Sequence, residues 1–153
     1  MLHDVINTGH DILATEWDER GFHLLEPEAM EWHPPVIRPV LGTAPTRPQD
    51  DRRPRNPDFV EEKSLVYPMP GEDRFPISIV KFPPNFVFPR HWHTDGEFVL
   101  ILAGSANFAG LDCGPGTMAY NDARTVYGAE AAGPDGCEFL MIRRAWAETH
   151  IVG

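Results

Sequence analysis

The chain has little of what marks secreted or nucleic-acid-binding proteins. It carries 2 cysteines, and its 13 lysines and arginines are outnumbered by 23 aspartates and glutamates. The formal net charge of −10 argues against nucleic acids and anionic membranes as partners, because both require clustered positive charge. Two cysteines are too few for a disulfide framework, so we expect a reduced cytoplasmic protein in which Cys113 and Cys137 are small buried apolar residues.

Long hydrophobic runs are also missing. The longest, 98–103, has the length of a strand and falls far short of the ~18 residues of a membrane span. Residues 1–12 have no cationic start followed by an apolar run, so they do not read as a signal peptide. We therefore expect no membrane partner and a small molecule as ligand. A chain of 153 residues is long enough to bury a core as one folded unit.

The first 63 residues differ in composition from the rest. Ile12, Leu13 and Trp17 lie at helical spacing and Gly21 is a plausible stop, so a short helix or turn is expected within 10–25. Residues 34–57 contain seven prolines, which exclude a helix or a central strand. We interpret 1–63 as an irregular proline-rich arm that packs on the barrel or on a partner subunit. Within it, 34–57 is either a solvated loop or a segment that crosses onto a second subunit or covers the barrel mouth.

From residue 64 to 153 the pattern is that of an all-β protein. Short β-rich runs alternate with turn residues, which favours a barrel or sandwich such as a double-sheet jelly roll. Hairpins are expected at 94–96, 103–105 and 110–116, where glycine adopts positive φ without strain. The expected strands are 64–69, 76–82, 85–91, 96–103, 105–109, 116–120, 124–130 and 137–144.

One constellation in this region carries chemistry. His91 and His93 are two residues apart, so on a strand they share a face, and Glu97 follows just past a short turn. Gly104 completes the spacing. Two imidazoles and one carboxylate with open coordination positions favour a non-haem ferrous ion, although Zn, Ni or Mn can occupy such a set.

This spacing resembles the first signature of the cupins, small β-barrels that commonly bind a metal inside. Pro115-Gly116 is similar to the opening of the second cupin motif, whose histidine position falls on Tyr127 here. Three arrangements are open for Tyr127. It is a hydrogen-bonding or acid–base group beside a metal held by the other three residues, a phenolate ligand, or part of a metal-free site for an organic ligand.

The strand around Glu97 has two apolar faces. If Glu97 points at a metal, Val99 and Ile101 line the barrel interior, and the row of Phe98, Leu100 and Leu102 faces outward. A strand that is apolar on both faces is usually covered on both, so we expect the N-terminal segment or a second subunit on the outside, and a homodimer as hypothesis.

Other candidates are weaker. Trp92, between the histidines, should face away, and Arg90 should do the same. Met118, Tyr120 and Arg124 are expected near the cavity, with Phe86 and Phe88 in its apolar wall. The remaining histidines have no ligand spacing, although His23 or His33 could supply a missing ligand from the arm; they are His3, His10, His23, His33 and His150.

The resemblance implies a function. Small single-domain cupins with this first motif are similar to dioxygenases that cleave carbon–carbon bonds, such as the acetylacetone-cleaving type. The resemblance implies that this chain is a mononuclear Fe(II) dioxygenase that acts on a small enol or diketone, with Glu97 and Tyr127 as catalytic groups. Two other classes stay open: a non-enzymatic metal- or ligand-sensing cupin, and a metal-free isomerase or epimerase.

Overall fold

The computed structural model is almost entirely β-structure, as the sequence predicted. It describes residues 25–34, 60–66, 73–144 and 149–152, and it describes the backbone alone at 5–6, 13–14 and 40–41. The expected arm segment 34–57 lies mostly outside these residues. No helix in the described part of the chain is long and apolar enough to cross a membrane. The division into an arm, 1–63, and a barrel, 64–153, stays a prediction.

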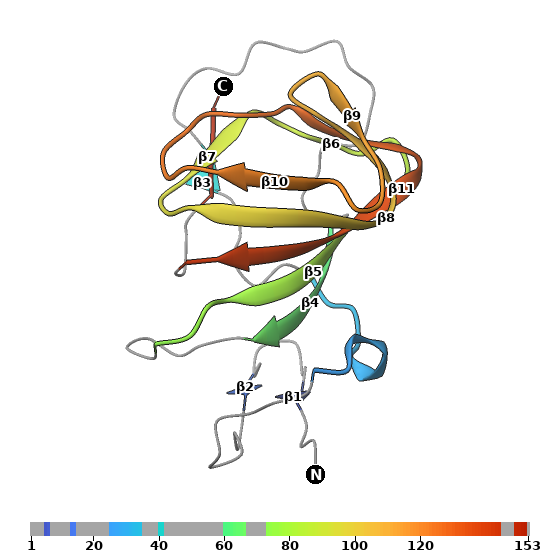
Figure 1. The fold of residues 1–153 in the computed structure, drawn as a ribbon, viewed down its shortest axis with the longest axis vertical. Coiled ribbons are helices and arrows are strands. Elements are labelled where there is room, and N and C mark those ends of the chain that lie inside the picture. Colours follow the sequence, from blue (N-terminus) through green and yellow to red (C-terminus); the bar gives the residue numbers. More distant parts are fainter. Residues whose placement is uncertain are drawn as a thin grey trace.

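A seven-stranded antiparallel sheet forms the larger wall of the barrel. Its main path places β10 (Met118–Asn121), β8 (Glu97–Phe108), β11 (Glu130–Arg143), β5 (Ile77–Phe82) and β4 (Glu61–Val66) side by side, in that order (Figure 1). Two short strands extend it: β6 (Val87–Phe88) pairs with β11, and β9 (Leu111–Cys113) pairs with β8. The sheet positions Glu97 and Arg143 directly opposite each other on neighbouring strands.

A smaller sheet carries the two histidines. In it β12 (Thr149–Ile151) lies between β7 (His91–His93) and β3 (Val40–Leu41). The turn expected at 94–96 is present, but it is not a hairpin, because β7 pairs with β12 and the chain then passes into the larger sheet. The histidines and Glu97 thus come from two different sheets.

The side chains of β8 alternate between the inner and outer faces of the sheet, as the sequence predicted. Glu97, Val99 and Ile101 are each at most 3% exposed and face inward, whereas Leu102 is 42% exposed on the outside. The core behind them contains Phe82, Phe86 and Phe139, with Cys137 among them. What covers the outer row, including the proposed homodimer, stays a prediction.

Several expected elements were wrong in detail. Strands 96–103 and 105–109 are one continuous strand, β8, and the sequence 133–136 lies inside β11 instead of separating two strands. Residues 124–129 form no strand apart from an isolated bridge at Tyr127, and Glu130 is the first residue of β11. Leu13–Ala14 is a strand, β2, paired with β1 (Val5–Ile6), and not part of a helix. Residues 10–12 and 15–24 lie outside the described residues.

A short segment ahead of β4 covers the edge of the larger sheet. It contains the single-turn 3₁₀ helix η1 (Pro27–Ala29), and a backbone bridge joins His33 to Glu62. Trp32 contacts two lysine ammonium groups, with Lys63 Nζ 4.7 Å and Lys81 Nζ 5.0 Å from its ring centroid. Pairing the edge strand in this way protects its free backbone groups.

Gly104 explains why two expected strands join. It has φ +71° and sits where the pairing of β8 with β11 shifts register, so it forms a bulge and not a hairpin turn. A Cβ atom at this position would press into the carbonyl oxygen of Gly136 on β11. Glycine is needed here for its backbone angle and for the close approach of the two strands.

We predict that Gly104→Ala lowers the free energy of unfolding by about 2–4 kcal/mol, because the methyl group adds a backbone clash to the strain of positive φ. Gly110→Ala is the matched control. Gly110 also has positive φ but has open space around it, so this change should cost only roughly 1–2 kcal/mol. Urea unfolding followed by circular dichroism measures both, and equal losses would contradict the clash.

Candidate functional site

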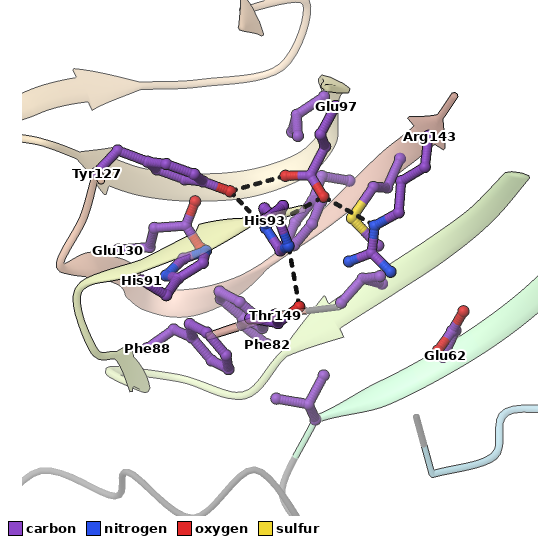
Figure 2. A pocket seen from close by; sticks show the side chains of 15 residues that line it. Glu62, Phe82, Phe88, His91, His93, Glu97, Tyr127, Glu130, Arg143 and Thr149 are labelled. Carbon is purple, nitrogen blue, oxygen red and sulfur yellow. Dashed lines mark hydrogen bonds and ion pairs between the residues drawn. The ribbon is translucent and has the colours of Figure 1, made fainter. Parts of the chain in front are cut away.

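A cavity lies between the two sheets and contains the predicted constellation (Figure 2). The centres of water-sized molecules can occupy about 80 Å³ of it. Its apolar side comes mainly from β5, β8 and β11. Polar groups from both sheets gather on the other side. The described side chains that line it are Val60, Glu62, Val80, Phe82, Phe88, His91, His93, Glu97, Val99, Tyr127, Glu130, Phe139, Met141, Arg143 and Thr149.

His91 and His93 both turn into this cavity from β7, as their spacing predicted, and they are 2% and 4% exposed. His91 Nδ1 lies 2.8 Å from the carbonyl oxygen of Pro89. A carbonyl only accepts, so Nδ1 carries the proton and the Nε2 lone pair of neutral His91 is left for the cavity. Burial lowers the pKa of His91, which keeps the ring neutral, although the Pro89 carbonyl and Glu97 act in the opposite direction.

His93 is held in a similar way. Its Nδ1 lies 3.0 Å from the hydroxyl oxygen of Thr149 on the neighbouring strand β12, so Nε2 faces the cavity. A metal-binding histidine typically has its second nitrogen fixed by such an outer partner. Trp92, between the two histidines, faces away as expected and stacks on His150, with ring centroids 4.0 Å apart and an interplanar angle of 6°.

Glu97 faces the histidines from the larger sheet. Its Oε2 accepts a hydrogen bond from Arg143 Nε at 3.0 Å and lies 3.4 Å from His93 Nε2. Burial by itself raises the pKa of this carboxyl. The charges of Arg143 and His93, with hydrogen bonds from Tyr127 and Arg143, outweigh burial and lower the pKa, so Glu97 is ionised.

Tyr127 bridges these two groups. Its hydroxyl lies 2.8 Å from His93 Nε2 and donates to Glu97 Oε1, also at 2.8 Å. Its backbone pairs with that of His91 through two hydrogen bonds of 3.0 Å, which brings the ring over the site. Burial and the nearby charges of Glu97 and Glu130 raise the pKa of the phenol, so in this structure Tyr127 is a neutral hydrogen-bonding group.

Sequence reasoning missed four polar residues of the cavity: Glu62, Glu130, Arg143 and Thr149. Arg143 lies 46 positions from Glu97, and only the pairing of β11 with β8 makes them neighbours. Glu130 is 7% exposed at the start of β11. Burial, followed by the charge of Glu97, raises its pKa to about 8, while Arg143 acts in the opposite direction. The sequence carried one signal for Glu130 and Arg143, because they lie within the predicted β-rich runs 124–130 and 137–144.

Some weaker candidates do not reach the cavity. Met118 and Tyr120 are 65% and 67% exposed, because they pair with the outward row of β8 at Leu100 and Phe98. Arg90 is exposed, as expected, and so is Arg124. Phe88 lines the cavity, whereas Phe86 is fully buried in the core.

His33 is not a ligand from the arm. Its Nδ1 lies 2.7 Å from the Pro34 carbonyl oxygen, and its Nε2 lies 3.3 Å from both the backbone nitrogen and the hydroxyl of Ser64. His3, His10 and His23 lie outside the described residues.

The side chains of His91, His93 and Glu97 are of the kinds that bind a divalent metal, but their donor atoms do not converge on one point in this structure. Among the described residues, no group of three or more His, Cys, Asp and Glu side chains is arranged to hold a metal ion. The contacts explain this: both oxygens of Glu97 are engaged, one by Tyr127 and one by Arg143. His91 Nε2 fits one ligand position as it stands, whereas His93 Nε2 and Glu97 Oε1 both bond the Tyr127 hydroxyl and fit the other two positions when that hydroxyl turns away.

Comparison with known proteins identifies the fold. No family model and no curated protein matches this chain. Among solved structures, the polyketide cyclase RemF from Streptomyces resistomycificus superposes with a TM-score of 0.55 at 19% identity, covering 80% of this chain and 78% of RemF. An RmlC-like cupin protein from Ralstonia eutropha JMP134 superposes with a TM-score of 0.51 at 18% identity, covering 78% of this chain and 66% of that protein. The chain has the cupin fold.

The fold neighbours include enzymes of different chemistry. Besides the cyclase, a solved structure of the DMSP lyases RdDddP and RnDddQII superposes with a TM-score of 0.51 at 15% identity, covering 61% of this chain and 53% of that one. At these identities the likeness establishes the cupin barrel, while the reaction depends on this chain's own cavity.

We predict that Glu130→Gln stabilises the metal-free protein at neutral pH. The pKa of Glu130 is raised from its ordinary 4.5 to about 8, so as pH rises through this window the unfolded chain ionises while the folded protein retains its proton. Wild type therefore loses stability relative to Glu130→Gln, by roughly 2–4 kcal/mol between pH 5 and pH 9. Urea unfolding with EDTA at several pH values measures this difference. A difference that does not change with pH would contradict it, and Glu138→Gln on the outward face is the matched control.

Proposed function

We propose that this cupin is a mononuclear metal-dependent oxidoreductase, an Fe(II) dioxygenase acting on a small enol- or diketone-like substrate. His91, His93 and Glu97 would hold the metal. When bound, a ferrous ion supplies Lewis acidity and the capacity to activate O2 beside a chelating substrate. One carbon–carbon bond of the substrate breaks, and the two atoms of O2 enter the two products.

One observation carries this proposal: both imidazoles have Nδ1 fixed by an outer oxygen and present Nε2 to one cavity. Two histidines that served only packing would need no such shared orientation. Burying two imidazoles and a carboxylate is costly unless they are paired or coordinate a metal. The carboxylate 3.4 Å from His93 Nε2 completes a two-histidine, one-carboxylate set, which is the set that suits non-haem iron.

The remaining residues would orient the substrate and control protons. Phe82, Phe88 and Phe139 form a wall that excludes water and favours an apolar substrate body. Tyr127, a neutral phenol beside His93, can donate a hydrogen bond to an oxygen that gains negative charge. Arg143 keeps Glu97 ionised and in place.

A second candidate is a metal-free acid–base enzyme, such as an isomerase or epimerase. The continuous hydrogen-bond chain favours it, because Tyr127 joins His93 to Glu97 without any further group between them. A proton can move along such a chain between substrate and Glu97. Metal content separates the two candidates.

We predict about one Fe(II) per chain when untagged protein is reconstituted anaerobically and desalted, as measured by inductively coupled plasma mass spectrometry. His91→Ala and His93→Ala should each reduce the bound iron at least tenfold, because each removes one of three ligands. His150→Ala is the control: this histidine stacks on Trp92 outside the cavity and should leave the iron content unchanged. Less than about 0.2 metal per chain in wild type would exclude the oxygenase and favour the metal-free enzyme.

We predict that Tyr127→Phe preserves metal binding but slows turnover. The change removes a hydroxyl that bonds both Glu97 and His93 and retains the aromatic ring. If Tyr127 only donates to a developing negative charge, iron content stays within twofold of wild type and kcat for O2 consumption with acetylacetone falls by roughly 10²- to 10³-fold. Loss of iron would instead assign Tyr127 as a ligand, and unchanged kcat would leave it without a catalytic role.

A further inference from the structure

Arg143 is a mostly buried cation that lines the cavity. It is the last residue of β11, directly opposite Glu97, and its side chain is 13% exposed. The cavity lining among the described residues includes no other arginine or lysine. Because a guanidinium stays charged throughout the accessible pH range, this positive charge is permanent.

The ion pair with Glu97 uses only part of the guanidinium. Glu97 Oε2 is contacted by Nε at 3.0 Å. Figure 2 shows the two terminal nitrogens turned away from Glu97. A guanidinium can bind a carboxylate through two parallel hydrogen bonds, and the side of Arg143 away from Glu97 has the donors for a second anion.

The surroundings favour one small anion with an apolar body. Phe82 and Phe139 meet edge to face at 5.0 Å and belong to the wall that lines the cavity, so the body of a ligand would contact aromatic surface. Two further carboxyl groups, Glu62 and Glu130, also line the cavity. The negative charge of Glu62 would repel a second negative charge on the ligand, so a monoanion is favoured over a dianion.

We propose that the substrate carries one carboxylate, bound by the face of the Arg143 guanidinium turned away from Glu97, so that the substrate class is a small β-keto acid or a carboxylated enol. This substrate assignment rests on the proposed function for its reaction, but the anion site itself needs no metal. The carboxylate would hold one end of the substrate at Arg143, while its keto or enol oxygen faces His93 and Tyr127.

Two probes of nearly the same size test the anion site. Acetoacetate carries a carboxylate, and acetylacetone has a methyl ketone in its place. Isothermal titration with metal-free protein in EDTA should show acetoacetate binding at least tenfold more tightly than acetylacetone. Arg143→Gln should remove this preference while changing the affinity for acetylacetone less than twofold. Arg143→Lys retains the charge but not the planar guanidinium, so its preference for acetoacetate should lie between those of wild type and Arg143→Gln.

Variants of Glu97 show whether Arg143 binds the substrate or only holds Glu97 in place. Arg143→Gln leaves Glu97 buried without its cation, so the double variant Arg143→Gln/Glu97→Gln serves as its charge-balanced counterpart and should show the same loss of preference. Glu97→Gln alone should keep or strengthen the preference for acetoacetate, because the guanidinium loses a competing carboxylate. Circular dichroism confirms that each variant is folded.

Three results would overturn the proposal: equal binding of the two probes by wild type, equal weakening of both by Arg143→Gln, or loss of the preference in Glu97→Gln. The last two would assign Arg143 to positioning Glu97 alone. Because these titrations use metal-free protein, absence of iron binding would overturn the oxygenase and leave the anion site standing. The reverse result, iron binding without a preference for acetoacetate, would overturn only the anion site.

Discussion

The structure of the cavity depends on one buried ion pair, between Glu97 on β8 and Arg143 on β11. These residues are directly opposed at the ends of the two longest strands, and their side chains meet on the inner face of the larger sheet. A carboxylate that is 3% exposed is costly to bury unless a cation and hydrogen bonds compensate. Removing either partner would leave a charge unpaired inside the barrel.

Tyr127 and His93 both contact this ion pair through Glu97. Tyr127 donates to the oxygen of Glu97 that Arg143 leaves free, and His93 lies beside the other oxygen. Thr149 and the Pro89 carbonyl fix the imidazoles from behind. The ionised state of Glu97 also helps to keep Glu130 protonated, because a second negative charge nearby is unfavourable. The ion pair thus adds to the effect of burial, which is the main cause of the raised pKa of Glu130 and of Tyr127.

The local part of this site was predictable, and the long-range part was not. Alternation on a strand predicted that His91 and His93 share a face, that Trp92 turns away, and that Glu97, Val99 and Ile101 point inward. No local signal could place Arg143 beside Glu97, because their contact depends on which strands pair. The hairpin at 103–105 was wrong because glycine permits a bulge as readily as a turn, and only the partner strand decides between them. Met118 and Tyr120 face outward because they pair with the outward row of β8, a register that local sequence does not determine.

The stacking of Trp92 on His150 has a consequence for studying this protein. The indole lies on the same short strand as the two cavity histidines but on the opposite face, so a ligand in the cavity does not touch it. Indole emission is sensitive to the position and charge of a stacked imidazole. Trp92 is therefore an intrinsic fluorophore on the outer surface of the strand that carries the site, and it would respond to movement of that strand without being quenched by direct contact with the ligand.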